Sequence, residues 1–220
     1  MLDESFPRKQ RGAPHGGWWV GVVAGLALVP AVVPVDTRLA AALTPDTLPW
    51  LVGVMGWVTW LGYGAVDIGI PVVIGLVGWG AGEAPWGRRG LWGGLAVAVA
   101  GLLDQAVKNL LCRARPSAAD AGAFFSGFPC APAPYALSSF PSGHATTGFA
   151  LAVVLSLWYP RLTVVWLLLA TAVGWSRIVL GSHFPSDVLA GAVLGLAVVL
   201  VFARWRPGLA GGEGRAHDSH

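Results

Sequence analysis

Three short polar strings interrupt an otherwise apolar chain, and they hold residue types that bind anions and exchange protons. They are residues 108–116, 141–144 and 176–187. Lysine and arginine bind anions, and histidine beside aspartate is typical of nucleophilic and proton-transfer chemistry. Because charged groups near a bilayer are costly, three such strings indicate a site that binds an anion and performs acid–base chemistry on it.

The first string predicts two anion-binding cations at the end of an apolar helix. Lys108 and Arg115 lie two helical turns apart, which places them on one face, and Pro116 is expected to end the helix. Asp104 lies one turn before Lys108 and is expected to pair with it. The alternative is that the two cations only reach the membrane interface and anchor the helix there.

The second string begins the next apolar segment. Pro141 suits the start of a helix, and Ser142 and Gly143 leave free backbone N–H groups that favour an anion. His144, which titrates near neutral pH, stands beside them. The alternative is an ordinary helix cap with an interfacial histidine.

The third string joins two further apolar segments. Ser176 and Arg177 end one of them, and His183 and Asp187 bracket the turn into the next. The four-residue spacing lets the carboxylate orient one imidazole nitrogen and leaves the other free as a nucleophile. The guanidinium of Arg177 can hold phosphate oxygens with paired hydrogen bonds. A purely structural turn is the alternative.

Taken together and in this order, the three strings resemble the signature of the type 2 phosphatidic acid phosphatases, with no departure at any signature position. The resemblance extends over about residues 17–205. It implies a membrane-bound, metal-independent phosphatase that needs no cofactor and acts on lipid phosphates. It also implies that the phosphoryl group is held by Lys108, Arg115, Ser142, Gly143 and Arg177.

The same resemblance assigns the chemical steps to three residues. His183 would attack phosphorus and become a phosphohistidine, and Asp187 would set its tautomer and stabilise the imidazolium. His144 would protonate the leaving oxygen and then activate the water that frees the enzyme. Phosphoryl transfer depends mainly on positioning and charge stabilisation, so three cations and helix-end amides are suited to it.

The composition predicts an integral membrane protein. Of the 220 residues, 55% are hydrophobic and 11% are charged, whereas soluble domains are about a quarter charged. The mean hydropathy is +0.65, and glycine (31) and tryptophan (12) are abundant, as is common in membrane helices and at their interfaces. The net charge of +3 comes without a clustered basic face, which argues against nucleic-acid binding.

The expected fold is an all-α bundle of six transmembrane helices with one short interfacial helix. A span needs roughly 20 mostly apolar residues. Residues 39–60 are interrupted by prolines and carry three tryptophans, so we expect them to lie at the interface, although a seventh span is the alternative. The expected spans are 17–35, 67–82 (beginning a few residues earlier, within 61–66), 90–111, 145–159, 162–180 and 188–205.

Charge bias predicts the orientation of this six-span domain, residues 17–206. Positive residues favour the cytoplasmic side. With the N-terminal tail (1–16) and a disordered tail (207–220) inside, nine Lys and Arg residues fall inside and five outside. Three of those five are the candidate anion-binding residues Lys108, Arg115 and Arg177, and without them the bias is nine to two. The site is therefore expected on the outer or periplasmic face of the plasma or inner membrane.

Two further features concern the outer loop, residues 117–140. Its aromatic residues are expected either to contact the lipid chain of a substrate or to anchor the loop at the interface. Cys112 and Cys130 both fall on the outer side, where a disulfide can form between them. Alternatively, Cys112 is a small buried apolar residue.

The expected partners are the bilayer and a lipid phosphate. Phosphatidic acid, phosphatidylglycerol phosphate, a polyprenyl diphosphate such as undecaprenyl diphosphate, and lipid A all present phosphate at this depth. The oligomeric state is left open. The alternatives are a phosphatase for a soluble phosphate ester, a vanadate-binding haloperoxidase, and a non-catalytic lipid-binding membrane protein.

Overall fold

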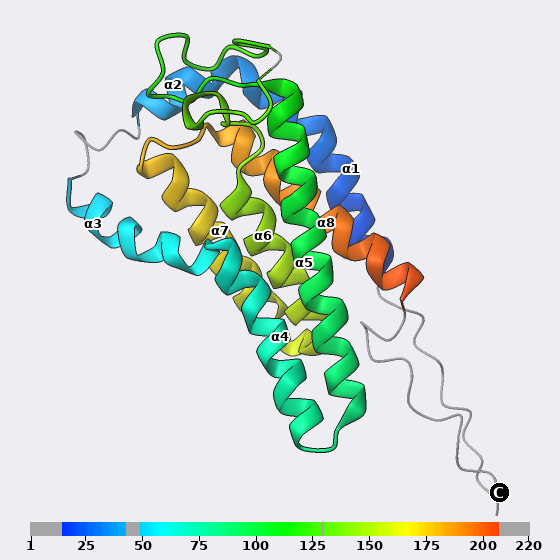
Figure 1. The fold of residues 1–220 in the computed structure, drawn as a ribbon. Helices are drawn as coiled ribbons and strands as arrows, with labels where there is room; N and C mark the ends of the chain where they lie inside the picture. Colours follow the sequence, from blue (N-terminus) through cyan, green and yellow to red (C-terminus); the bar gives the residue numbers. More distant parts are fainter. Residues whose placement is uncertain (1–14, 43–48, 129, 207–220) are drawn as a thin grey trace, which may run out of the picture.

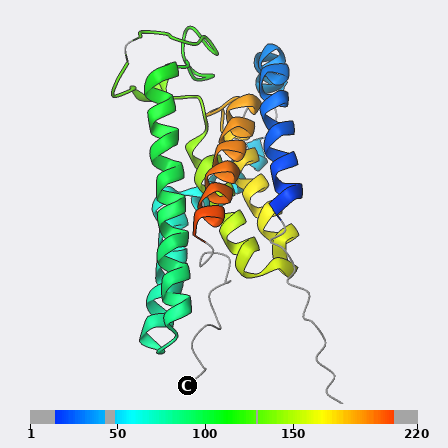
Figure 2. The same ribbon diagram turned by 90° about the vertical axis from the view of Figure 1, so that its right-hand side faces the viewer.

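The computed structural model describes residues 15–42, 49–128 and 130–206, and within these ranges every regular element is helical. Figures 1 and 2 show the long helices side by side, with the long loop after α5 (Ala84–Leu111) and the turn between α7 (Thr163–Val179) and α8 (Pro185–Trp205) at the same end. The expected tails, apart from His15 and Gly16, lie outside the described residues.

The N-terminal helix is longer than expected. α1 (His15–Val32) continues through the short helix η1 (Val33–Val35) into α2 (Asp36–Ala42). The candidate span is Gly17–Ala42, against the predicted 17–35. The extension brings Asp36, the first residue of α2, into the polar end of the bundle, where its buried carboxylate contacts Arg113 and Ser186.

The single interfacial helix predicted for residues 39–60 is not confirmed. Residues 39–42 belong to α2, and the described remainder forms α3 (Pro49–Val58) and the start of η2 (Thr59–Gly62). α4 (Gly64–Gly80) follows at an angle of 47° to the preceding helix. The bend occurs at Tyr63, whose backbone is extended and so interrupts the helix. Pro45 and Asp46 lie outside the described residues.

The remaining helices run up and down between the two ends of the bundle (Figure 1). α5 is followed by the long loop, which holds η3 (Tyr135–Leu137), and then by α6 (Gly143–Trp158). η4 (Pro160–Leu162) leads into α7.

Among the described residues, four helices are long and apolar enough to cross a membrane, or five if the bent pair α3–α4 is one span. α6 is apolar but shorter, at 16 residues. These helices indicate a multi-pass membrane protein.

Close contacts between glycines and neighbouring backbone bring the helices together. A Cβ atom placed on Gly90 of α5 would lie 2.3 Å from the Cα atom of Gly75 in α4. On α8, a Cβ on Gly191 would lie 2.6 Å from the Ser142 carbonyl oxygen, and one on Gly195 2.2 Å from that of Thr146. Small residues allow this approach in membrane helices. As a result, the start of α8 lies directly against the start of α6.

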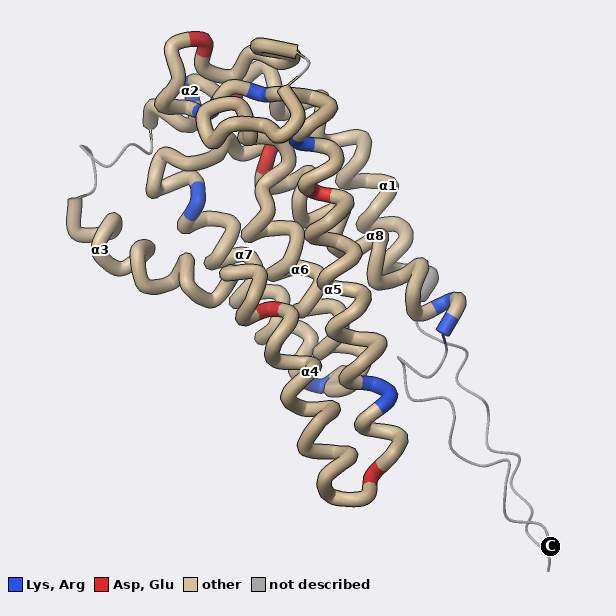
Figure 3. The backbone as a smooth tube through the Cα atoms, viewed as in Figure 1, with Lys and Arg blue, Asp and Glu red and all other residues tan. Residues whose placement is uncertain are grey.

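The charged residues gather toward the two ends of the bundle (Figure 3). α5 begins with Arg88 and Arg89 in its first turns and ends near Lys108, and α8 runs from Asp187 to Arg204. The three polar strings therefore meet at one end, and the remaining described arginines of α5 and α8 lie at the other.

Candidate active site

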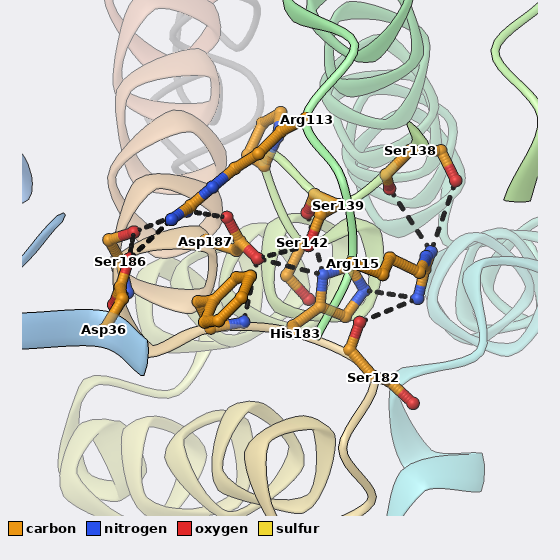
Figure 4. Close-up of polar contacts among 12 residues, drawn as sticks. Asp36, Arg113, Arg115, Ser138, Ser139, Ser142, Ser182, His183, Ser186 and Asp187 are labelled. Carbon is orange, nitrogen blue, oxygen red and sulfur yellow. Dashed lines mark hydrogen bonds and ion pairs between the residues drawn. The ribbon is translucent and has the colours of Figure 1, made fainter. Parts of the chain in front are cut away.

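His183 occupies the centre of the polar end of the bundle (Figure 4). It lies in the turn between α7 and α8 and is only 2% exposed. Its Nδ1 lies 2.8 Å from the carbonyl oxygen of Ser139. Because a carbonyl oxygen only accepts, Nδ1 carries the proton and Nε2 keeps a free lone pair. Nε2 faces Arg115, with 3.4 Å to Nη1.

The surroundings of His183 keep its ring neutral. Burial lowers the pKa of His183 to about 4, although Asp187 acts in the opposite direction. The positive charges of Arg115 and Lys108 lower this pKa further. A neutral imidazole with a free Nε2 is the form that can act as a nucleophile at pH 7.

Asp187 acts on His183 through a neighbour as well as directly. Its Oδ2 lies 3.6 Å from His183 Nδ1, which is longer than a hydrogen bond. The same oxygen accepts hydrogen bonds from the hydroxyl of Ser139, at 2.6 Å, and from the backbone N–H of Phe184, at 2.8 Å. Ser139 therefore links the carboxylate to the imidazole: its hydroxyl donates to Asp187 and its carbonyl accepts from His183.

Arg113 holds Asp187 from the other side, and the sequence analysis gave it no role. Its guanidinium forms ion pairs with Asp187 and with Asp36 of α2, the latter at 2.8 Å. It also donates to the hydroxyl of Ser186, at 2.7 Å. All four side chains are buried. In the sequence, Arg113 and Asp36 are charged residues in apolar surroundings, and each therefore requires a partner of opposite charge. That requirement could have indicated that the two residues belong to the site.

Lys108 pairs with Asp104, as predicted from their spacing. It also donates to the carbonyl oxygen of Pro141, which ties α5 to the segment before α6. Thr146 of α6 donates to the second oxygen of Asp104, at 3.0 Å. A Cβ atom on Gly143 would lie 3.7 Å from Lys108 Nζ, so the ammonium group lies beside the first residue of α6.

Arg115 does not share a helix face with Lys108, so that prediction is wrong. α5 ends at Leu111, because Cys112 adopts a left-handed conformation with φ of 44°. The guanidinium instead donates to the carbonyl oxygens of Tyr135, Ser182 and Ser138, at 2.8, 2.9 and 3.2 Å. Burial lowers the pKa of Arg115, but a guanidinium remains charged at neutral pH.

Two polar groups at the site have no partner within the described part of the chain. Ser142 precedes α6, but its side chain does not cap the helix, and its buried Oγ makes no hydrogen bond. Arg177 donates from Nη1 to the hydroxyl of Thr59, at 2.6 Å, and its buried Nε is unpaired. Buried polar groups are nearly always hydrogen-bonded. These two atoms are therefore candidates for binding a polar ligand.

His144 completes the group. It is the second residue of α6 and is partly buried. The positive charges of Arg177, Lys108 and Arg115 all act on it, so the three strings converge in space. The first N–H groups of α6 lack intrahelical acceptors and add further donors to the same place.

The long loop after α5 is tied to the end of that helix. Cys112 and Cys130 form a disulfide with a Cα–Cα distance of 6.1 Å. Phe124 packs inside the protein against Arg113, with 4.6 Å between the guanidinium carbon and the centroid of the Phe124 ring. Phe125 and Phe128 are exposed and in contact with each other, which leaves them free to meet a lipid.

No group of three or more His, Cys, Asp or Glu side chains suited to a metal ion occurs within residues 15–42, 49–128 and 130–206. The chemistry available at this end of the bundle comes from arginines, a lysine, two histidines and helix-end amides. Such a set can bind a phosphoryl group and exchange protons with it.

Comparison with known proteins gives a consistent result. A family model described as the PAP2 superfamily matches residues 89–210, more than half of the chain. The lipid A 1-phosphatase of Rhizobium johnstonii is 38% identical over 112 residues, which are 49% of this chain and 46% of that protein. The chain thus spans about half the length of this curated relative.

Two crystal structures resemble most of the chain. The PAP2-type phosphatidylglycerolphosphate phosphatase of Bacillus subtilis matches with a TM-score of 0.63 and 26% identity, over 87% of this chain and 94% of that one. LpxE of Aquifex aeolicus matches with a TM-score of 0.59 and 23% identity, over 77% and 95%. The second likeness concerns the fold alone.

Proposed function

The chain belongs to the PAP2 superfamily, and from that premise we propose that it is an integral membrane lipid phosphatase. The observation that carries the proposal is the geometry of His183. Its Nδ1 is hydrogen-bonded to a carbonyl, and its Nε2 points toward Arg115. A neutral imidazole held in this way is suited to attack phosphorus.

The reaction proceeds through a phosphohistidine. Nε2 of His183 attacks the phosphorus atom as the bond to the leaving oxygen breaks, and His144 donates a proton to that oxygen. His144 then removes a proton from a water molecule that attacks the phosphohistidine and releases phosphate. Positive charge that develops on His183 is stabilised by Asp187, which Arg113 and Ser139 hold in place.

The phosphoryl oxygens are bound by groups that other contacts leave available. Ser142 Oγ and Arg177 Nε are buried and unpaired among the described residues. Arg115 and Lys108, which also keep internal hydrogen bonds, and the Gly143 amide add further donors to the phosphoryl group. Preorganised donors of this kind stabilise a phosphoryl transition state without a metal ion.

The membrane arrangement consists of six crossings, with the bent pair α3–α4 as the second and α6 as the fourth. Both termini lie in the cytoplasm, and the site faces the outside or the periplasm. The separation of the described arginines between the two ends of the bundle supports this orientation. The substrate is a lipid phosphate of the kinds named for the relatives, lipid A or phosphatidylglycerol phosphate, or else phosphatidic acid or a polyprenyl diphosphate.

The test is phosphate release by purified protein in detergent with EDTA. Lipid phosphates form one panel and glucose 6-phosphate forms a separate arm. We expect release from at least one lipid and transfer of substrate ³²P onto the protein. His183→Asn should abolish both release and labelling, because it removes the nucleophile.

Asp120→Asn changes an exposed loop residue and serves as the matched control. It should retain full activity and labelling. Turnover that survives in His183→Asn would contradict the mechanism, as would a strict requirement for a divalent metal. A preference for glucose 6-phosphate over every lipid would contradict the substrate class.

A further inference from the structure

A second polar site lies deeper in the bundle, apart from the His183 site. A cavity of about 120 Å³ is lined by residues of η2, α4, α6 and α7 and is partly open to the outside of the bundle. Its walls are almost entirely apolar. Asp67 of α4 and Trp166 of α7 are the charged or hydrogen-bonding side chains among the residues that line it.

Both polar groups are buried and unpaired within the described parts of the chain. Asp67 is 0% exposed, and neither carboxyl oxygen has a hydrogen-bond partner. The hydroxyl of the neighbouring Thr147 donates its one proton to the Gly143 carbonyl, at 3.1 Å. The indole N–H of Trp166 also has no acceptor. Two such groups in one cavity point to a polar ligand.

The lining restricts the chemistry of that ligand. No Lys, Arg or His lines the cavity, and an isolated carboxylate in an apolar membrane interior is costly, so the carboxyl is held as the neutral acid. A neutral carboxyl can donate and accept, whereas an indole only donates. A hydroxyl group can accept from Trp166 and exchange a hydrogen bond with Asp67. An ammonium group would leave the indole unpaired, and a phosphate would meet no cation.

The cavity adjoins the residue that protonates the leaving group in the proposed reaction. Leu61 lines it, and Gly62 is the next residue. A Cβ atom on Gly62 would lie 3.2 Å from the His144 carbonyl oxygen and 2.2 Å from Val173, which lines the cavity. Gly62 therefore separates His144 from the cavity by a single residue.

We propose that this cavity binds the hydroxyl head of a lipid alcohol, the product formed when a phosphomonoester lipid loses its phosphate. The inference rests on the proposed function and narrows its substrate class. A monoester leaves an alcohol, whereas a diphosphate leaves a monophosphate, which a cavity without cations does not accommodate. After His144 protonates the alkoxide, the new hydroxyl leaves the phosphate site and binds Asp67 and Trp166.

The experiment measures binding of an alcohol without turnover. Dodecan-1-ol carrying a diazirine is photolysed with the full chain and with His183→Asn in detergent, and labelled peptides are mapped by mass spectrometry. Labelling is expected on α6 and α7 residues that line the cavity, with competition by unlabelled dodecan-1-ol. Asp67→Asn keeps a donor and an acceptor of the same shape and should bind within about twofold of wild type.

Two variants remove the hydrogen bonds. Asp67→Leu should weaken alcohol binding by about tenfold or more, which corresponds to about 1.4 kcal/mol. Trp166→Phe should weaken alcohol binding several-fold. This variant provides the test if Asp67→Leu does not fold. Labelling that is unchanged in both variants, or confined to residues outside the cavity, would overturn the proposal.

Head-group specificity gives the decisive comparison. Dodecylamine or dodecyl phosphate that competes better than dodecan-1-ol would also overturn the proposal. Phosphatase activity without alcohol binding would refute this inference alone. Alcohol binding without any phosphate release would refute the proposed function alone, so the two failures are distinguishable.

Discussion

Arg113 and Arg177 lie at the same end of the bundle, yet their surroundings differ sharply. Arg113 is enclosed by Asp36, Ser186 and Asp187 and packs against the rings of Phe124 and Phe184. Arg177 donates to Thr59 and keeps a buried, unpaired Nε. Both are arginines in an apolar protein, so residue type alone does not separate their roles.

The difference shows that hydrogen-bond partners distinguish side chains with a structural role from side chains that can bind a ligand. A side chain whose donors are all satisfied holds other groups in position, and its removal leaves buried charges uncompensated. A buried side chain with an unused donor carries an energetic cost that a ligand can remove. The same distinction applies to the hydroxyls of Ser139, which is paired, and Ser142, which is not.

The largest effect is expected on stability when Arg113 is replaced. Arg113→Met leaves the carboxylates of Asp36 and Asp187 buried without their cation. The free energy of unfolding in detergent should fall by about 3–5 kcal/mol. Thermal or denaturant unfolding of the purified protein measures this change.

Arg177→Met is the matched control, because it removes a partly buried guanidinium whose hydrogen-bond partner among the described residues is Thr59. Its free energy of unfolding should change by about 1 kcal/mol or less. Phosphate release should nevertheless fall about 100-fold or more, since a phosphoryl-binding donor is lost. Equal destabilisation by the two substitutions would break the distinction drawn between the two arginines.

A somewhat smaller effect is expected from the protonation of His183. Its pKa is lowered from 6.5 to about 4, because burial disfavours the imidazolium. The unfolded chain therefore takes up a proton first as the pH falls. The stabilising contribution is complete above about pH 6.5 and is lost between about 6.5 and 4, by on the order of 3 kcal/mol.

The difference in unfolding free energy between wild type and His183→Asn, measured from pH 7 to pH 4, isolates this contribution. Wild type should lose stability more steeply over that range, because the variant has no imidazole to protonate. Parallel profiles for the two proteins would show that the ring is not held neutral by burial.

The smallest effect is expected at Ser142. Ser142→Ala removes a hydroxyl that makes no hydrogen bond among the described residues, so the free energy of unfolding should change by less than about 0.5 kcal/mol. Phosphate release should fall by about tenfold, because a donor to phosphate is lost. Assays of unfolding and of phosphate release on one preparation test both expectations.

Ser139→Ala sharpens the same comparison. It removes the hydroxyl that donates to Asp187. The free energy of unfolding should fall by about 1–3 kcal/mol, because the buried carboxylate of Asp187 loses a hydrogen-bond donor. If Ser142→Ala destabilised the protein as much as Ser139→Ala, the assignment of Ser142 to ligand binding would be wrong.

Sequence reasoning succeeded where spacing along one helix decides the outcome. The Asp104–Lys108 pair follows from the four-residue repeat of a helix. The apolar segments predicted the helical membrane bundle, and the predicted start of the second span within residues 61–66 agrees with α4, but the predicted end of the first span near residue 35 was wrong. Those boundaries depend on where the chain bends at Tyr63 and on where α2 docks, which are tertiary events.

Sequence reasoning failed where a partner comes from a distant segment. Arg113 and Asp36 are 77 positions apart, and no local pattern links them. Ser139 was overlooked because its role depends on a hydroxyl and a carbonyl that face different partners. Arg115 was placed on a helix that in fact ends before it, because the left-handed turn at Cys112 was not foreseen.

The sequence by itself determined the chemistry available to this protein: three cationic and histidine-containing strings at the ends of apolar helices. Only the tertiary structure decided which of those side chains are hydrogen-bonded to other parts of the protein and which keep donors for a ligand. The physical reason is that hydrogen bonding and burial depend on neighbours in space. Glycine contacts between α6 and α8 bring Asp187 beside Ser142, and the packing around His183, not its identity, keeps that ring neutral.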